Sequence, residues 1–447
     1  MSDRPDGHGT SLRRWLRPGM GVKRWLAVVF MGELLLALAG ALAIRLAFRD
    51  VPADSPAGQV FDLVSLQFLA QPARPLVVLL LGAAIFLYGS WRLVRVLLEP
   101  FPLRSEPLVE LIYQKRSLAR GPRIAAIGGG TGLSALLRGL KESSSNITAI
   151  VTVADDGGSS GMLRTELGLP PVGDLRNCIA ALADAEPAMA RLLQYRFPQD
   201  PDDPSTKGVS GHAFGNLLIA ALSDIEGDFE EGVRRSNQVL AVRGKVVPVA
   251  GEALTLHAEM SDGSTLEGQS LIGRSRGIRR VWIAPPDVAA SGDAIDSIAA
   301  AELIVMGPGS LYTSLLPSLL VPGIRSALKE ATGLRVYVAN VATQLGETEG
   351  YTLGEHLAAL RAHGVGDLVD VVVANDNRSA RVPRGYPSAP VVLDLPPDQT
   401  APRLVLADVV DDHNAHHHDP RKLAALLVLL HEERVDSRAR PAAVRTA

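Results

Sequence analysis

The segment from residue 123 to residue 177 constrains the fold more than any other part of the chain. The apolar run Arg123–Ile127 leads directly into the glycine-rich stretch Gly128–Gly132, and a helix-like stretch follows. A second apolar run, Ile147–Val153, leads into the acidic and glycine-rich stretch Asp155–Gly161. This alternation of buried strand, loop and helix is typical of a doubly wound α/β sheet, in which loops at the carboxyl ends of neighbouring strands form a ligand cleft.

The first glycine loop has the composition of a phosphate-binding loop. Backbone N–H groups in the first turn of a helix lack intrahelical partners and carry the positive end of the helix dipole. A phosphate binds there when no side chain blocks its approach. We therefore interpret Gly128, Gly129, Gly130, Thr131 and Gly132 as a phosphate cradle. A tight strand-to-helix turn without a ligand is the alternative. The loop is not a Walker A motif, because no Gly-Lys-Ser/Thr follows it.

The second loop carries two adjacent carboxylates and is a candidate site for Mg²⁺. This ion prefers oxygen ligands and often takes one or two carboxylates plus substrate phosphates. We assign Asp155 and Asp156 as candidate metal ligands, together with Asp174 at the start of the next helix. The alternatives are an Asx turn at the pair, an N-cap at Asp174, and a ribose contact made by an acidic side chain after the second strand.

Two later strands also end in polar or glycine-rich loops. Leu303–Met306 runs into a glycine loop and a helix, which repeats the arrangement of the first cradle, and Val336–Ala339 ends in an asparagine. Ligands of open α/β sheets bind outside the carboxyl ends of the strands. The candidate nucleotide- and phosphate-binding residues beyond the first cradle are therefore Gly157, Gly158, Ser159, Ser160, Asn177, His212, Asn216, Gly307, Gly309, Ser310 and Asn340.

The pattern also predicts strands outside the central repeat. Alternating runs on both sides of Ser261-Asp262-Gly263 predict a β-hairpin. With Val281–Ala284 it would form a small antiparallel insertion beside a mostly parallel sheet. Arg243–Lys245 would either bring positive charge to an anionic ligand or form a solvated turn, and the turn is favoured for Lys245. We interpret Val391–Leu395 and Leu404–Val410 as the strands that complete the sheet.

The N-terminal quarter of the chain has the pattern of a membrane hairpin. Residues 25–98 contain two apolar runs, Trp25–Phe48 and Leu76–Leu98, each about long enough to span a bilayer. Basic residues are denser outside the two runs than between them, which predicts that both termini and the main domain are cytoplasmic. A soluble hydrophobic hairpin is the alternative. The predicted divisions are a basic N-terminus (1–24), two transmembrane helices (25–99), a linker (100–121), the main domain (122–432) and a polar tail (433–447).

Charge and cysteine usage exclude some classes of function. The formal net charge of −3 argues against a nucleic-acid partner, which would require a basic surface. The single cysteine, Cys178, excludes an internal disulfide framework and a multi-cysteine zinc site. The run His416–His418 is interpreted either as a metal site or as a solvated loop. A helix to Leu430 would follow it, with Asp419 as N-cap and proline at the first helical position.

Five motifs occur in order over residues 123–432: Ile127–Leu133, Val151–Gly161, Gly173–Cys178, Gly211–Asn216 and Gly307–Ser314. Together they resemble the gluconeogenesis factor family, the bacterial branch of the 2-phospho-L-lactate transferase (CofD-like) superfamily. The resemblance implies a Rossmann-like fold and binding of a UDP-sugar such as UDP-N-acetylglucosamine or UDP-glucose. It also implies a role in cell shape and envelope synthesis during growth on gluconeogenic carbon sources.

The transferase branch of the superfamily moves phospholactate from a guanosine diphosphate-type donor to a deazaflavin, with a divalent metal at aspartates. By position, the resemblance makes Asp155 or Asp156 and Asp174 the metal candidates. Val153-Ala154 before the aspartates and the Gly-Gly-Ser-Ser loop after them depart from that branch and argue against transferase activity. The N-terminal hairpin is a further departure, because most similar proteins are expected to be soluble.

Three functions follow from these observations. The favoured one is a membrane-tethered cytoplasmic sensor of a nucleotide sugar that regulates envelope precursor supply, because no nucleophile–base pair is evident. Its apolar helix surfaces permit a homodimer. The second is a Mg²⁺-dependent transferase in which Asp156 and Asp174 hold the metal. The third is a dinucleotide-dependent oxidoreductase, permitted by Asp155 and by a Gly130-to-Ala135 glycine register but without a recognisable proton donor.

Overall fold

The computed structural model describes residues 115–184, 187–198, 209–380, 388–394 and 402–439, with isolated residues between 33 and 88. The chain divides into two compact units, Met1–Lys115 and Arg116–Ala447, and the second contains the α/β domain. Most of the predicted transmembrane hairpin, and residues 100–114 of the predicted linker, lie outside the described residues. Within the described part of the chain, no helix is both long and apolar enough to cross a membrane.

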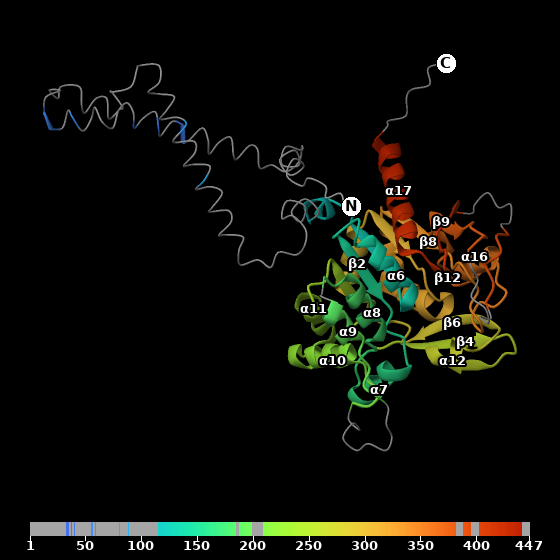
Figure 1. Cartoon of the computed structure of the whole chain (residues 1–447). Helices are drawn as coiled ribbons and strands as arrows, with labels where there is room; N and C mark the ends of the chain where they lie inside the picture. The colour runs from blue at the N-terminus through green and yellow to red at the C-terminus, as the bar shows by residue number, and fades with distance from the viewer. Residues whose placement is uncertain are drawn as a thin grey trace, which may run out of the picture. The chain divides into compact units, whose positions relative to one another are not determined.

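Seven parallel strands form the central sheet, in the order β10-β9-β8-β7-β1-β2-β3 (Figure 1). The strand order reverses between β1 and β7, whose register pairs Ile124 with Leu303 and Ile127 with Met306. This topology confirms the predicted Rossmann-like doubly wound fold. The strands are β1 (Ile124–Gly128), β2 (Ile147–Val151), β3 (Lys245–Pro248), β7 (Leu303–Met306), β8 (Leu334–Val338), β9 (Val371–Asn375) and β10 (Arg403–Ala407).

Helices enclose the sheet, and α6 packs between α8 and α17 (Figure 1). Among the described residues from β1 onward, the α-helices are α6 (Gly130–Leu140), α7 (Gly158–Leu167), α8 (Gly173–Leu182), α9 (Pro187–Gln194), α10 (Phe214–Glu226), α11 (Phe229–Val239), α12 (Gln269–Ile272), α13 (Gly292–Ala300), α14 (Leu316–Leu320), α15 (Pro322–Glu330), α16 (Leu353–Ala362) and α17 (Pro420–Ala439). A π-helix, η2 (Leu311–Leu315), precedes α14, and a short 3₁₀-helix, η3 (Gly366–Leu368), precedes β9.

The core lies on both sides of the parallel strands. Every residue of β1 and β7 is buried, as expected for strands covered on both faces. On α6 the buried leucines 133, 136, 137 and 140 recur at the spacing of one helical face. The apolar side chains whose spacing predicted these elements therefore also pack them together. This packing sets the positions of the loops that follow β1 and β7.

The antiparallel insertion is confirmed as a three-stranded sheet in the order β5-β4-β6. Its strands are β4 (Thr255–Met260), β5 (Thr265–Glu267) and β6 (Ile278–Ala284).

Three local predictions are wrong. Lys245 does not end a turn but begins β3, the edge strand beside β2. Residues 391–394 form no strand of the sheet and make only isolated bridges, such as Val392 with Thr352. Helix α17 continues past the predicted end at Leu430 to Ala439, so it takes in part of the predicted polar tail.

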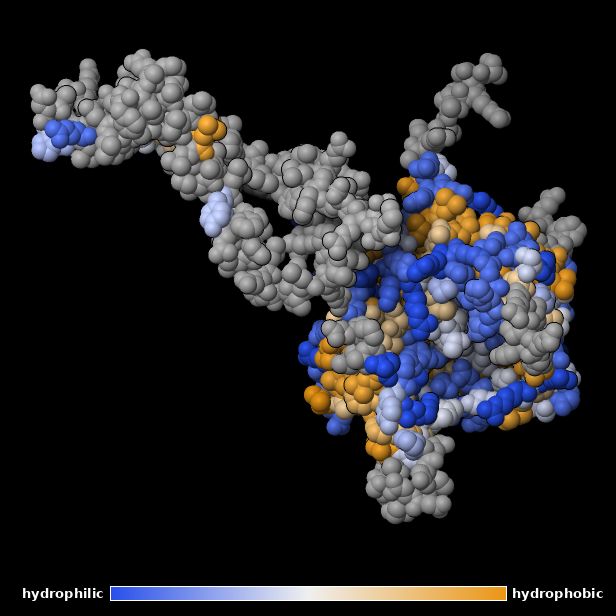
Figure 2. Space-filling view, in the orientation of Figure 1, coloured by the Kyte–Doolittle hydropathy of each residue, from blue (hydrophilic) through white to orange (hydrophobic). Residues whose placement is uncertain are grey.

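Hydrophobic side chains gather on the face in view in Figure 2, over α9 and α10 and beside α17. Among the described residues, exposed apolar side chains on these helices include Ile225 of α10, which is 74% exposed, and Leu429 of α17, which is 50% exposed. Exposed apolar areas of this kind are common at protein interfaces. They permit the predicted homodimer, which stays a prediction.

Candidate functional site

The loops after β1 and β7 meet backbone to backbone at the point where the strand order reverses. A Cβ atom at Gly132 would lie 2.7 Å from the carbonyl oxygen of Pro308, and one at Gly309 would lie 3.2 Å from the carbonyl oxygen of Gly129. Larger residues would push the two loops apart. This close approach therefore requires glycine at position 132 and favours it at position 309, in addition to any contact with a ligand.

A cavity of about 550 Å³ lies beside these loops. Of the predicted ligand residues, it is lined by Gly129, Gly130, Thr131, Gly132, Gly309, Ser310 and Asn340. The other polar lining residues were not predicted as nucleotide ligands; they are Ser314, Thr343, Gln344, Ser388 and the His416–His418 run, which was predicted as either a metal site or a solvated loop. We call this cavity the switch-point cleft.

One backbone N–H group of the predicted cradle already donates a hydrogen bond to a carboxylate of the protein. The N–H of Gly130, the first residue of α6, donates to Oδ2 of Asp174 over 2.7 Å. A Cβ at Gly129 would lie 2.5 Å from that oxygen, so glycine is needed for the carboxylate to approach. Burial raises the pKa of Asp174 to about 6, and the nearby charge of Asp155 adds to the rise. The amides of Thr131 and Gly132, which follow in the helical turn, line the cleft.

A second carboxylate occupies the start of η2. Oε1 of Glu347 accepts hydrogen bonds from the backbone N–H groups of Tyr312 and Thr313 over 2.6 and 2.9 Å. Glu347 is only 4% exposed, and burial raises its pKa. The repeated glycine loop predicted that these amides would be free for a phosphate, but they already donate to Glu347. Instead Ser310 lies at the cleft, where its Oγ accepts a hydrogen bond of 2.8 Å from Nε2 of Gln344.

The two adjacent aspartates point to different partners. Oδ1 of Asp155 accepts from the N–H of Gly157 in the predicted Asx turn, whereas Oδ1 of Asp156 accepts from the N–H of Ser270 in α12 over 2.8 Å. Asp155 and Asp174 lie close enough for their charges to interact, but Asp156 does not join them. In the part of the chain that the structure describes, no group of three or more histidine, cysteine, aspartate and glutamate side chains is arranged to hold a metal ion.

Four further predicted residues form one buried cluster away from the switch-point cleft. Oγ of Ser159 accepts from the backbone N–H of Ala213 and from Nδ2 of Asn216, so its hydroxyl hydrogen faces Nδ1 of His212 over 3.2 Å. Asn177 joins the cluster through Arg176, whose guanidinium donates to the Oδ1 atoms of Asn216 and Asn177. The cluster connects the starts of α7, α8 and α10.

The remaining predicted ligand residues of the glycine loops have a role in backbone conformation. Oγ of Ser160 accepts from the N–H of Gly173 at the start of α8. Gly128, Gly158 and Gly307 have positive φ angles of 153°, 49° and 83°, a region that favours glycine. None of these three glycines is among the residues that line the switch-point cleft.

The histidine run is not a solvated loop. It lies in β12 (Asn414–His418), which pairs with β11 (Val410–Asp411) in an antiparallel hairpin at the cleft. Nδ1 of His416 contacts Oγ of Ser388 over 2.8 Å. Nε2 of His418 lies 3.2 Å from the carbonyl oxygen of Ala339, which requires the hydrogen on that nitrogen. Burial lowers the pKa of His418 to about 4, so its ring is neutral at pH 7.

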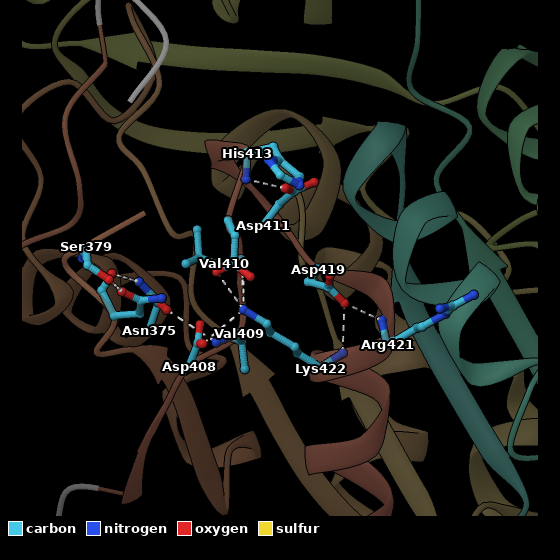
Figure 3. A network of polar contacts seen from close by, with 12 residues as sticks. Asn375, Ser379, Asp408, Val409, Val410, Asp411, His413, Asp419, Arg421 and Lys422 are labelled. Carbon is cyan, nitrogen blue, oxygen red and sulfur yellow. Dashed lines mark hydrogen bonds and ion pairs between the residues drawn. The ribbon is translucent and has the colours of Figure 1, made fainter. Parts of the chain in front are cut away.

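A polar network fixes this hairpin to the start of α17 (Figure 3). Nζ of Lys422 donates to a carboxylate oxygen of Asp408 over 2.9 Å and to the carbonyl oxygen of Val410 over 3.1 Å. Oδ1 of Asp419 accepts from the N–H groups of Arg421 and Lys422, which confirms Asp419 as the predicted N-cap. The histidines are thus held at the cleft by the helix that follows them in the sequence.

Comparison with known proteins decides the family. Residues 124–407 match the family described as 2-phospho-L-lactate transferase CofD. A Bacillus subtilis protein named gluconeogenesis factor is 45% identical over 323 residues, which cover 71% of this chain and 100% of that protein. The chain belongs to the gluconeogenesis factor family. A crystal structure of a Bacillus halodurans protein, described as a member of the upf0052 family, is 40% identical with a TM-score of 0.63 and covers 69% of this chain and 99% of that one.

The N-terminal region is shared with only some relatives of this gluconeogenesis factor. A protein from Nostoc sp. that also carries the gluconeogenesis factor name is 44% identical over 432 residues, which cover 93% of this chain and 91% of that protein. An alignment of this extent includes much of the region before residue 122. The N-terminal region is therefore a departure from the Bacillus subtilis relative but not from the Nostoc relative.

We expect His418 to make the stability of this gluconeogenesis factor pH-dependent. Because its folded pKa is about 4 and the unfolded value is near 6.5, the unfolded chain binds the proton more readily between these values. The stabilising contribution is present above pH 6.5 and falls by about 3 kcal/mol as pH drops to 4. Urea unfolding of wild-type protein and the His418→Gln variant at pH 4 to 8 measures the difference. The exposed His413, varied to Gln, is the matched control and should keep the wild-type pH dependence. The same pH dependence of the unfolding free energy in all three proteins would contradict the role of His418.

Proposed function

We propose that this protein binds a UDP-sugar in the switch-point cleft and thereby regulates carbon flux into envelope precursors and cell shape during gluconeogenic growth. The observation that carries the proposal is a cavity of about 550 Å³ at the strand-order reversal, enclosed by two glycine loops. This position is where open α/β sheets bind nucleotides, and the volume lies within the range of small-molecule sites.

The proposed pose sets the diphosphate against the first turn of α6. The amides of Thr131 and Gly132 and the helix dipole would meet its charge, since no lysine or arginine is among the described residues that line the cleft. The uracil and sugar would then extend toward Gln344 and the β12 histidines, whose polar atoms can donate to or accept from hydroxyl and carbonyl groups.

A second candidate function is a Mg²⁺-dependent transferase of the phospholactate type. The proximity of Asp155 and Asp174 at the start of α6 favours it, because Mg²⁺ commonly takes one or two carboxylates together with substrate phosphates. These two residues, and not Asp156, would hold the ion. When bound, Mg²⁺ would neutralise charge on a diphosphate.

The N-terminal region supports a further part of the proposal, a membrane tether. Residues 25–98 would anchor the protein with both termini and the main domain in the cytoplasm, near envelope synthesis. The support is the charge and hydropathy pattern of the sequence. A homodimer and a protein partner in envelope synthesis stay predictions.

Calorimetric titration of the full-length protein with UDP-N-acetylglucosamine tests ligand binding. We expect saturable binding and an about tenfold weaker affinity for the Gln344→Ala variant, which removes one hydrogen-bonding group from the cleft. Gln238→Ala is the matched control, because Gln238 lies on the surface of α11 and should leave the affinity unchanged.

Three outcomes of that titration are decisive. Absence of binding to any UDP-sugar would contradict the proposed ligand. An equal loss in both glutamine variants would contradict the proposed site. Mg²⁺-dependent binding of a guanosine nucleotide with release of product would instead favour the transferase, and an Asp174→Asn variant should then abolish turnover.

Cell fractionation tests the membrane tether. We expect the full-length protein in the membrane pellet, resistant to extraction with alkaline carbonate, because two transmembrane helices are not released by removal of surface charge. Recovery in the soluble fraction would contradict the tether and leave the proposal for the switch-point cleft unaffected.

A further inference from the structure

Two arginines lie near the start of α10, and neither is among the residues that line the switch-point cleft. Arg176 lies in the first turn of α8 and is 9% exposed. Arg196 follows α9 and is exposed, and its Nη1 donates to the carbonyl oxygen of Gly211. Arg196 pairs with Ala213 in an isolated backbone bridge, and Arg176 packs against Gly215, so both positive charges lie beside the start of α10 and repel each other.

The buried guanidinium is only partly compensated by the protein. Its Nη1 and Nη2 atoms donate to the side-chain amide oxygens of Asn216 and Asn177 over 3.1 and 3.0 Å. Within the part of the chain that the structure describes, Nε of Arg176 has no hydrogen-bond partner. Asp174 and Asp155 act on Arg176 through their charge and not through a hydrogen bond. A buried cation with neutral partners and a free donor is costly without an anion.

The surrounding backbone is shaped to admit Arg176 and leaves a helix start open. A Cβ at Gly215 would lie 2.8 Å from Cγ and Cδ of Arg176, so this glycine gives the side chain its place against α10. The ten-residue helix α7 begins close to Arg176. Asn216 connects the two, because it contacts both Arg176 and Ser159, and Ser159 lies in the first turn of α7. Among the described residues, no side chain caps α7, and none places an atom within 4 Å of a Cβ position at Gly158.

We propose that Arg176, Arg196 and the N-terminus of α7 form a second anion-binding subsite that takes a phosphate-sized oxyanion. Guanidinium groups match the geometry of phosphate oxygens, and the unpartnered Nε supplies one further donor. The anion would also separate the two like charges. Free inorganic phosphate and the phosphate group of a sugar phosphate share this chemistry. The inference does not depend on which nucleotide occupies the switch-point cleft.

Helix α8 connects this subsite to the switch-point cleft. It carries both Arg176 and Asp174, and Asp174 receives the N–H of Gly130 at the cleft. An anion at the arginines therefore lies two residues along the chain from the carboxylate at the start of α6. This arrangement lets a phosphorylated compound bind beside a nucleotide ligand without competing for the same atoms.

Thermal-shift titration of the full-length protein with inorganic phosphate and, separately, glucose 6-phosphate tests the subsite. We expect a saturable rise in the unfolding temperature with at least one probe, because a ligand that binds only the folded state stabilises it. The Arg196→Gln variant should bind that probe with an affinity at least about tenfold lower, as expected for loss of a charge-assisted hydrogen bond. Its affinity for UDP-N-acetylglucosamine should change by less than about twofold. Arg196 is exposed, so this variant should fold.

Two further variants sharpen the test. Arg191→Gln is the matched control, because Arg191 is an exposed arginine on α9 and should leave both affinities unchanged. Arg176→Lys keeps the charge but loses the planar fork, and should weaken the phosphate probe. A tighter fit to glucose 6-phosphate than to phosphate would support a sugar phosphate as ligand, and equal affinities would support free phosphate.

Four results would overturn the subsite. They are no response of the wild-type protein to either probe, an equal loss in the Arg191→Gln control, unchanged phosphate binding in both Arg176→Lys and Arg196→Gln, and a parallel loss of UDP-sugar binding in Arg196→Gln. The last would assign the arginines to the nucleotide site. Intact phosphate binding without any UDP-sugar binding would support the subsite and contradict only the proposed nucleotide ligand.

Discussion

The close approach of two backbone loops at the β1–β7 junction is the constraint on which the rest of the structure depends. Parallel strands that are buried on both faces bring their carboxyl ends to one edge of the sheet. At this junction the carbonyl oxygen of Pro308 lies where a Cβ of residue 132 would clash, and Gly129 and Gly309 are similarly close. Only glycine lets the two loops meet and leaves their helix starts beside the cleft.

Helix starts at this junction carry unpaired N–H groups, and the protein supplies its own carboxylates to part of them. Asp174 accepts from Gly130 and Glu347 accepts from the start of η2. Both carboxyl pKa values are raised by burial, because removal from water disfavours the charged form. Thr131 and Gly132, which follow Gly130 in the first turn of α6, line the switch-point cleft.

The sequence predicted the doubly wound sheet because its strands are short apolar runs followed by glycine or asparagine. It did not predict β3, which starts with Lys245 and has only four residues, nor β12, which has no apolar alternation and is a strand through its pairing with β11. The predicted site residues do not all lie in one place. Asp156 accepts a hydrogen bond from Ser270, whereas Asn216 accepts one from Arg176. These contacts join residues 114 and 40 positions apart, and a single sequence contains no signal for them.

Hydrogen–deuterium exchange of the full-length protein, with and without saturating UDP-N-acetylglucosamine, tests the central claim most directly. The account predicts slower exchange in three segments that line the switch-point cleft: residues 129–133 at the start of α6, residues 340–345 after β8, and β12. The antiparallel sheet of β4, β5 and β6 should be unchanged. Slower exchange confined to other segments, with the start of α6 unaffected, would contradict nucleotide-sugar binding at the junction of β1 and β7.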